Sequence, residues 1–198
     1  RRITFLSVTF LTAIFLSATF FLYTHSANAS NLTLNNTPVE VYFSPNGGCT
    51  SAIIKELRNA KTEILVQAYS FTSAPIAKAL IDAKKRGVSV EVILDKSQRS
   101  EKYTSATFLA NMRIPVYIDA RHAIAHNKVM IIDKETVITG SFNFTKAAEE
   151  KNAENLLIIK SKELAGKYIE NWHKHKEHSE SIGQGIKKDV LRYLKKII

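Results

Sequence analysis

The amino-acid sequence predicts an α/β fold: one domain in which a mixed β-sheet is flanked by helices on both faces. Three observations predict this class. Apolar runs of strand length alternate with amphipathic helical patterns in the first half of the chain, which is typical of βαβ units. Two further apolar runs are joined by a short polar turn and indicate an antiparallel hairpin. The composition, 45% apolar and 23% charged, is that of an ordinary globular domain.

The expected elements follow from the period of their apolar residues. Strands show short runs rich in Val and Ile, and helices show apolar residues three or four positions apart. We expect strands at residues 39–43, 63–69, 88–94, 115–118, 126–132, 136–142 and 155–160. We expect helices at residues 51–60, 74–86, 104–112, 145–150 and 162–176. Crossover helices give parallel pairs and a hairpin gives an antiparallel pair, so the sheet should be mixed.

The first 29 residues have the pattern of a targeting segment. Two arginines precede an apolar run at residues 3–23, and Ala-Asn-Ala at residues 27–29 suits a signal peptidase. The run of 21 residues is longer than a usual signal core and close to the ~20 that span a bilayer. We therefore expect residues 1–29 to be a signal peptide or an N-terminal membrane anchor, with a linker at residues 30–37. Either implies export, to the periplasm, the outer face of the inner membrane or the exterior, and the segment could associate with the membrane.

Positive charge dominates the chain. Lys and Arg outnumber Asp and Glu by 28 to 18, and the net charge is +10. Such a surface attracts polyanions, so nucleic acid or an anionic membrane is a candidate partner, and charge for solubility is the alternative. Lys96, Arg99 and Lys102 follow a predicted strand where a nucleic-acid backbone could lie. Residues 179–198 are expected to form a basic C-terminal tail.

Cysteine and the scattered histidines give little indication of a metal site. Cys49 is the only cysteine, which excludes an intramolecular disulfide and a cysteine zinc site, and we expect it to be a small buried residue. His173, His175 and His178 lie among lysines, and since residues 173 and 175 do not share a helical face, we expect a solvated surface. His122 could contact substrate, but we expect it to belong to a structural loop.

Polar residues interrupt the central hairpin in a pattern that carries chemistry. His126 and Lys128 are two residues apart on the first strand, and Ser141 and Asn143 are two apart on the second, so each pair should project to one face. Polar groups in buried strands are costly unless they serve one another or a ligand. A lysine, an amide, a hydroxyl and an imidazole are groups that bind and attack phosphate.

The spacing of these residues resembles the H-x-K-x4-D-x6-G-S-x-N signature of the phospholipase D superfamily. The signature is met at His126, Lys128, Asp133, Gly140, Ser141 and Asn143. Segments at residues 41–45, 94–98 and 152–155 also resemble the single-motif bacterial endonucleases of that family, so the resemblance covers about residues 38 to 175. It implies a phospholipase D-like nuclease domain at residues 38–178.

The resemblance also implies a mechanism without metal or cofactor. His126 would attack phosphorus and form a covalent phosphohistidine. Lys128 and Asn143 would hold the non-bridging phosphate oxygens, and Ser141 would support that pocket. Glu154 is expected to orient His126 as a carboxylate does in a catalytic triad.

Two alternatives concern Asp133, for which a structural role and a direct interaction with the imidazole are both open. The chain carries a single motif, whereas the leaving alkoxide needs a second proton carrier. The second His126 should therefore come from another subunit of a twofold homodimer.

We expect an endonuclease that hydrolyses DNA or RNA, and the alternative is a phospholipase D or cardiolipin hydrolase acting on anionic phospholipid. No metal-binding cluster is expected, so activity should survive EDTA.

Overall fold

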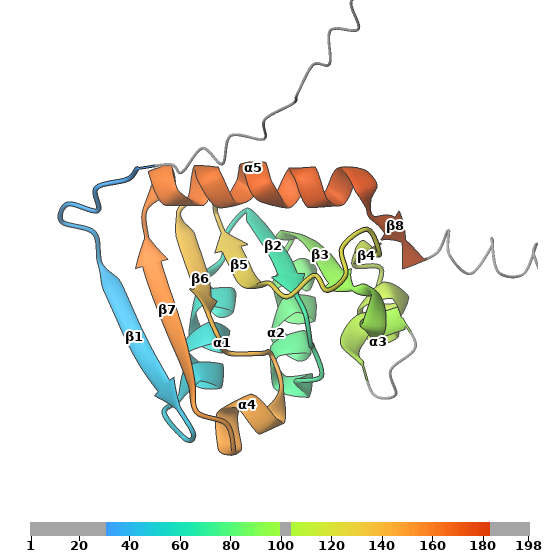
Figure 1. Cartoon of the computed structure of the whole chain (residues 1–198), viewed down its shortest axis with the longest axis horizontal. Coiled ribbons are helices and arrows are strands. Elements are labelled where there is room, and N and C mark those ends of the chain that lie inside the picture. The colour runs from blue at the N-terminus through green and yellow to red at the C-terminus, as the bar shows by residue number, and fades with distance from the viewer. Residues whose placement is uncertain (1–30, 100–103, 183–198) are drawn as a thin grey trace, which may run out of the picture. The chain divides into compact units, whose positions relative to one another are not determined.

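In residues 31–99 and 104–182, which the computed structural model describes, eight strands form one sheet in the order β1-β7-β6-β5-β2-β3-β4-β8 (Figure 1). The strands are β1 Val39–Ser44, β2 Glu63–Ala68, β3 Ser89–Asp95, β4 Val116–Asp119, β5 Lys128–Ile132, β6 Thr136–Gly140, β7 Glu154–Lys160 and β8 Glu180–Ser181. β2, β3 and β4 pair in parallel, and the other neighbours are antiparallel. The predicted mixed sheet is thus confirmed.

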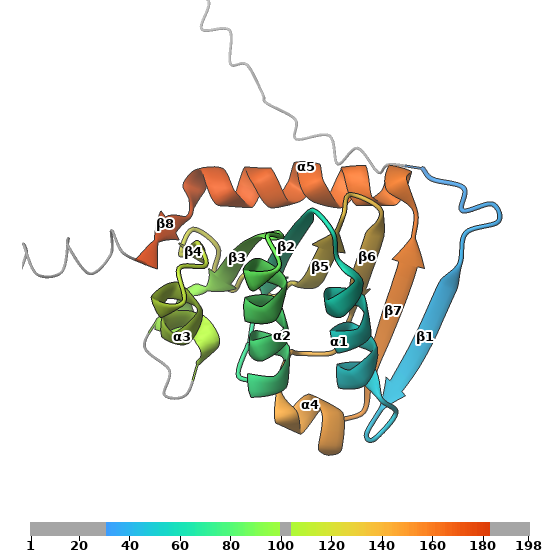
Figure 2. The same cartoon turned by 180° about the vertical axis from the view of Figure 1, so that it is seen from behind.

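Helices cover both faces of the sheet, as predicted. They are α1 Cys49–Asn59, α2 Ala74–Lys85, α3 Ser105–Asn111, α4 Lys146–Glu150 and α5 Lys162–His178, with a short 3₁₀ helix, η1, at Lys96–Arg99. α5 lies across one face, and α1 and α2 lie on the other (Figures 1 and 2). The alternation of strand side chains builds two cores, because Ile64 and Val66 face α1 and α2 whereas Leu65 faces α5.

Trp172 fixes α5 to the sheet. Its side chain is fully buried, and its indole Nε1 donates a hydrogen bond to the carbonyl oxygen of Val66 at 2.9 Å. Leu65, Ile93 and Ile131 form the apolar floor beneath the helix. Cys49 is buried on the opposite face, as expected for a small apolar residue, and burial raises the pKa of its thiol to about 11.

The end of the domain lies beyond the predicted boundary at residue 178. Ser181 of β8 pairs with Tyr117 of β4, so the first residues assigned to the tail belong to the sheet. The polar pair Glu180-Ser181 has no strand pattern of its own, and its position beside β4 decides its conformation. The predicted leader and the rest of the basic tail lie outside the described residues. Among the residues that the structure does describe, no helix is both long and apolar enough to cross a bilayer.

The register of the sheet brings the ends of several strands to one edge. Ala68 at the end of β2 pairs with Lys128 at the start of β5, and Ser44 at the end of β1 pairs with Glu154 at the start of β7. Asp95 and Asp119 pair at the ends of β3 and β4. We call this border of the sheet the site edge, because the motif residues of β5, β6 and β7 lie along it.

Candidate active site

Tyr69 positions the two basic residues of the motif. The imidazole of His126 packs on its ring with 4.6 Å between centroids, and Lys128 Nζ lies 5.0 Å from the same centroid. Lys128 Nζ also donates a hydrogen bond to the carbonyl oxygen of His126 at 2.9 Å. The aromatic face thus attracts the ammonium while it holds the imidazole. His126 itself is exposed, as a nucleophile must be to reach a substrate.

Lys128 is a nearly buried cation, with 7% of its surface exposed. Burial lowers the pKa of Lys128, and the negative charge of Glu154 partly opposes this effect. A cation with few water contacts interacts strongly with an anion that enters the site, because water screens the attraction poorly there. Lys128 is therefore suited to bind a phosphate oxygen.

Asp95 holds the loop that leads to the nucleophile. Its Oδ2 accepts a hydrogen bond from the backbone N–H of Ala125 at 2.7 Å, and its Oδ1 accepts one from Ser97 at 2.9 Å. Burial tends to raise the pKa of Asp95, but these hydrogen bonds outweigh it and lower the pKa. The ionised carboxylate thereby fixes the chain one residue before His126. The sequence alone indicates no role for Asp95 beyond its place in the segment 94–98 that resembles the family.

Strand β6 ends where its backbone closely approaches the start of β7. Gly140 has φ +147°, and a Cβ there would lie 2.3 Å from the carbonyl oxygen of Asn155, so only glycine fits. That oxygen accepts hydrogen bonds from the backbone N–H groups of Ser141 and Phe142 at 3.1 and 3.2 Å. The hydroxyl of Ser141 accepts one from the N–H of Asn155 at 3.1 Å. Ser141 therefore shapes the turn, and β6 ends two residues earlier than predicted.

Asn143 presents an unsatisfied amide atom. Its Oδ1 is buried and makes no hydrogen bond within the described part of the chain. Buried polar atoms are nearly always paired, so this amide has hydrogen-bonding capacity that the described residues do not use. Rotation of the amide by 180° exchanges oxygen and nitrogen, which puts the Nδ2 donor in that position. Asn143 could then donate to a non-bridging phosphate oxygen.

The recorded interactions of Glu154 are with Asn152 and Lys128 rather than with the imidazole of His126. Its Oε1 accepts a hydrogen bond from the side chain of Asn152 at 3.1 Å, and its charge acts on Lys128. Between residues 31–99 and 104–182 the structure records no hydrogen bond from His126 to Glu154. The expected orienting role of Glu154 stays a prediction.

Asp133 follows the far end of β5 from His126 and Lys128, a position that does not favour its assignment to the catalytic group, which stays a prediction. The five residues that separate it from Lys128 correspond to about 16 Å of strand. Its carboxylate accepts hydrogen bonds from the backbone N–H groups of Lys61, Thr62 and Glu63 at 2.8, 2.7 and 3.1 Å, and from Thr62 Oγ1 at 2.9 Å. Of the two roles left open for Asp133, the structure supports the structural one.

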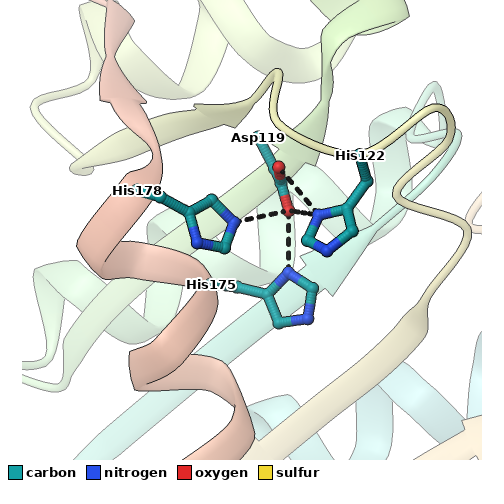
Figure 3. Close-up of side chains that lie close together, drawn as sticks. All are labelled: Asp119, His122, His175 and His178. Carbon is teal, nitrogen blue, oxygen red and sulfur yellow. Dashed lines mark hydrogen bonds and ion pairs between the residues drawn. The ribbon is translucent and has the colours of Figure 1, made fainter. Parts of the chain in front are cut away.

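Two of the three histidines expected on a solvated surface, His175 and His178, are instead largely buried beside Asp119. The ring nitrogens of His122, His175 and His178 are directed at one carboxylate oxygen of Asp119 (Figure 3), and the possible metal-ligand atoms of the four residues lie within 4.8 Å of one another. We call these four residues the histidine cluster. His175 and His178 share a helical face because they are three residues apart, whereas His173 is exposed and stacks edge-on against Trp172.

The cluster centres on the buried carboxylate of Asp119. Burial alone would raise the pKa of Asp119, but its interactions with His175, His122 and His178 outweigh burial and hold this pKa well below its usual range. His122 lies in the expected loop, and its carbonyl oxygen accepts a hydrogen bond from Lys96 Nζ at 3.2 Å. The cluster is therefore joined to the loop that leads to His126.

Comparison with known proteins agrees with this geometry. The family model described as "Cardiolipin synthase, PLD-like domain" matches residues 53–176. The chain is 47% identical over 139 residues to a phospholipase D of Rickettsia conorii, covering 70% of each protein. It is 38% identical over 175 residues to a phospholipase D of Rickettsia prowazekii, covering 82% of this chain and 85% of that one.

A solved structure shows the same fold. The crystal structure of Nuc from Salmonella typhimurium, a phospholipase D family member, has a TM-score of 0.70 and 40% sequence identity, and the match covers 73% of this chain and 97% of Nuc. The matched family region holds all six signature residues. The chain therefore belongs to the phospholipase D-like family of phosphodiesterases.

Proposed function

We propose that the protein is an endonuclease that hydrolyses nucleic acid through a covalent phosphohistidine at His126. The observation that carries the proposal is the convergence at the site edge of an exposed imidazole, a buried ammonium and an unpaired amide. These groups belong to His126, Lys128 and Asn143. A phosphodiester has one phosphorus for the nucleophile and two non-bridging oxygens for the two other groups.

The reaction proceeds in two displacements. An unprotonated imidazole nitrogen of His126 attacks phosphorus, the P–N bond forms, and the P–O bond to the leaving strand breaks. The leaving oxygen takes a proton from a second imidazole, that of His126 of the partner subunit. Water then attacks phosphorus and gives a proton to this second imidazole, the P–N bond breaks, and both histidines return to their starting forms. Lys128 and Asn143 stabilise the negative charge at the phosphate in both steps.

Exposed apolar residues around the site support a homodimer. Ile124, two residues before His126, is 57% exposed, and Phe43, which pairs in register with Asn155, is 67% exposed. Large apolar side chains at a surface are typical of interfaces when they lie together around a site. A partner subunit that brings its own His126 to the site would cover both.

Exposed cations along the site edge support nucleic acid as the substrate. Lys96 follows β3, Arg121 follows β4, and Lys151 precedes β7, and all three are exposed. A long polyanion can contact several such groups at once, whereas a single lipid head group cannot. Arg99 forms an ion pair with Glu180 at 3.1 Å, and Lys102 lies outside the described residues.

Phospholipid is the second candidate substrate. The observation in its favour is that the similar Rickettsia proteins are named phospholipase D. The chemistry at phosphorus would be the same, since a phospholipid is also a phosphodiester. The name Nuc of the similar solved structure points to nucleic acid instead.

A parallel assay separates the two substrates. The full chain is incubated with single-stranded DNA, duplex DNA, RNA and vesicles of cardiolipin or phosphatidylcholine, with His126→Ala as the inactive variant. His173→Ala is the matched control, since His173 is an exposed histidine outside the motif. We expect nucleic-acid cleavage that His126→Ala loses and His173→Ala keeps. Head-group release without nucleic-acid cleavage would replace the nuclease by a lipid hydrolase, and cleavage that persists in His126→Ala would refute the mechanism.

A further inference from the structure

The histidine cluster joins three separate parts of the chain at the site edge. Asp119 ends β4, His122 lies in the loop that leads to His126, and His175 and His178 are on the last turn of α5 (Figure 3). The site described above uses none of the four side chains. Their convergence is not a result of chain proximity, because Asp119 and His175 are 56 residues apart in the sequence.

Hydrogen bonds alone leave this cluster unsatisfied. Oδ2 of Asp119 faces Nδ1 of His175 at 2.7 Å and Nδ1 of His122 at 2.9 Å, which already matches the two lone pairs of a carboxylate oxygen. Nε2 of His178 is 3.3 Å from the same oxygen, yet it is buried and makes no hydrogen bond in the described part of the chain. Nε2 of His178 is therefore paired with Asp119 only as an ion pair at 3.3 Å, which requires a protonated ring, and no hydrogen bond satisfies it in the described part of the chain.

The distances suit a small cation. A tetrahedral ion with bonds of about 2.0–2.1 Å separates its ligand atoms by roughly 3.3–3.5 Å. The three nitrogens lie 2.7, 2.9 and 3.3 Å from the carboxylate oxygen, and no two of the four ligand atoms are more than 4.8 Å apart. Tetrahedral coordination would require the nitrogens of His175 and His122 to move about half an ångström away from the carboxylate oxygen. An ion at the centre would accept a lone pair from each atom, that of His178 included.

We propose that the histidine cluster binds one divalent transition-metal ion of the Zn²⁺ class in a structural role. Three imidazole nitrogens and one carboxylate oxygen are ligands that such ions prefer. Four protein ligands leave no open position for a water or a substrate, which is the mark of a structural rather than a catalytic zinc site. His122, with 44% of its side chain exposed, gives the ion a route from solvent, whereas Asp119 is fully buried.

The consequence concerns the loop between β4 and β5. Asp95 holds this loop at Ala125, and Lys96 holds it at the carbonyl oxygen of His122. A bound ion would add a third attachment, to the end of α5. The segment that carries the nucleophile would then be fixed from the sheet and from the helix at once.

Metal titration of the full chain tests the proposal. The protein is freed of metal with dipicolinate and titrated with Co²⁺ and Zn²⁺. We expect one ion per chain, a visible Co²⁺ absorption of tetrahedral intensity, and a melting temperature that rises by about 5 °C or more at a Zn²⁺ concentration near 100 times Kd. EDTA should reverse the rise. A wild-type protein that shows neither binding nor a change in melting temperature at micromolar to millimolar metal overturns the proposal.

Variants locate the ion. His178→Gln and His175→Gln each remove one ligand and should weaken binding by at least about 100-fold. His173→Gln is the matched control, because His173 is an exposed histidine of the same helix outside the cluster. It should bind metal as the wild type does. Full binding by His178→Gln, or its loss in His173→Gln, places the ion elsewhere and refutes the cluster. If a cluster variant fails to fold, the Co²⁺ spectrum of the wild type and metal binding by His173→Gln still test the proposal.

Discussion

Replacing Asp133 tests whether the aspartate of the motif serves stability or catalysis. Asp133→Ala removes four hydrogen bonds that hold the segment 61–63 against the turn between β5 and β6. A hydrogen bond to a charged group contributes about 1.5–3 kcal/mol when it is well buried. Three of these hydrogen bonds are exposed and the fourth is only partly buried, so we take about 0.5–1 kcal/mol for each of the four. The expected loss in the free energy of unfolding is about 2–4 kcal/mol, or roughly 5–12 °C in melting temperature.

Asp133→Asn is the milder change. The amide of asparagine keeps one oxygen that accepts hydrogen bonds, and asparagine tolerates the positive φ of +52° at this position. We therefore expect about half of the loss in the free energy of unfolding. Thr62→Val removes one hydrogen bond and should cost about 0.5–1 kcal/mol. Melting is followed by circular dichroism, and activity is normalised to folded protein. A fall of more than about 100-fold in the activity of folded Asp133→Ala, with an unchanged melting temperature, would refute the structural role.

The pH dependence gives an independent check. Burial tends to raise the pKa of Asp133, but hydrogen bonds from Thr62, Glu63 and Lys61 outweigh it and lower the pKa. A carboxyl whose pKa is lower in the folded state stabilises the protein above its unfolded pKa of about 3.9, and this contribution is lost as pH falls through the folded pKa. The stability difference between wild type and Asp133→Asn should therefore be full near pH 6 and shrink below about pH 4.

Four further predictions concern the active site. His126→Ala should abolish turnover. Lys128→Met or Asn143→Ala should lower kcat by roughly 100-fold or more while circular dichroism shows an intact fold, because these groups act on transition-state charge. An unchanged kcat in Lys128→Met would contradict this role. When wild type and His126→Ala subunits exchange freely, activity should fall as the square of the wild-type fraction, and a linear fall or an active monomer would exclude the shared site. Binding to nucleic acid should weaken steeply between low and physiological salt. Cleavage by the folded protein should survive EDTA, even where the chelator lowers the melting temperature. Complete loss of cleavage in EDTA that Mg²⁺ restores would overturn the metal-free reaction.

Local pattern was sufficient to predict most of the sheet. The seven strands with alternating or continuous apolar residues were predicted near their observed positions, since burial of one or both faces leaves a period in the sequence. β8 was missed because two polar residues carry no such period and take their conformation from β4. β5 was predicted to start two residues too early and β6 to end two residues too late. At the end of β6, the contact of Gly140 with Asn155 interrupts the strand at a point that only the three-dimensional structure defines.

The motif residues could be predicted as a group, but their supports could not. His126 and Lys128 lie together because they are two residues apart, whereas Tyr69, which contacts both, comes from a distant strand end without any local signal. The histidine cluster depends in the same way on the meeting of β4 with α5. The spacing of His175 and His178 was the only hint in the sequence, and it has no meaning until Asp119 is placed beside it.

The burial of Trp172 makes the protein its own optical probe. The sequence has one tryptophan, and it lies between α5 and β2 with its indole hydrogen-bonded to Val66. Its fluorescence therefore reports on a single contact, with no second indole to obscure the signal. Detachment of α5 would expose the ring to water and shift its emission to the red, even where circular dichroism shows that the sheet is still folded. Undocking of one helix and unfolding of the whole domain can thus be followed separately in the unlabelled protein.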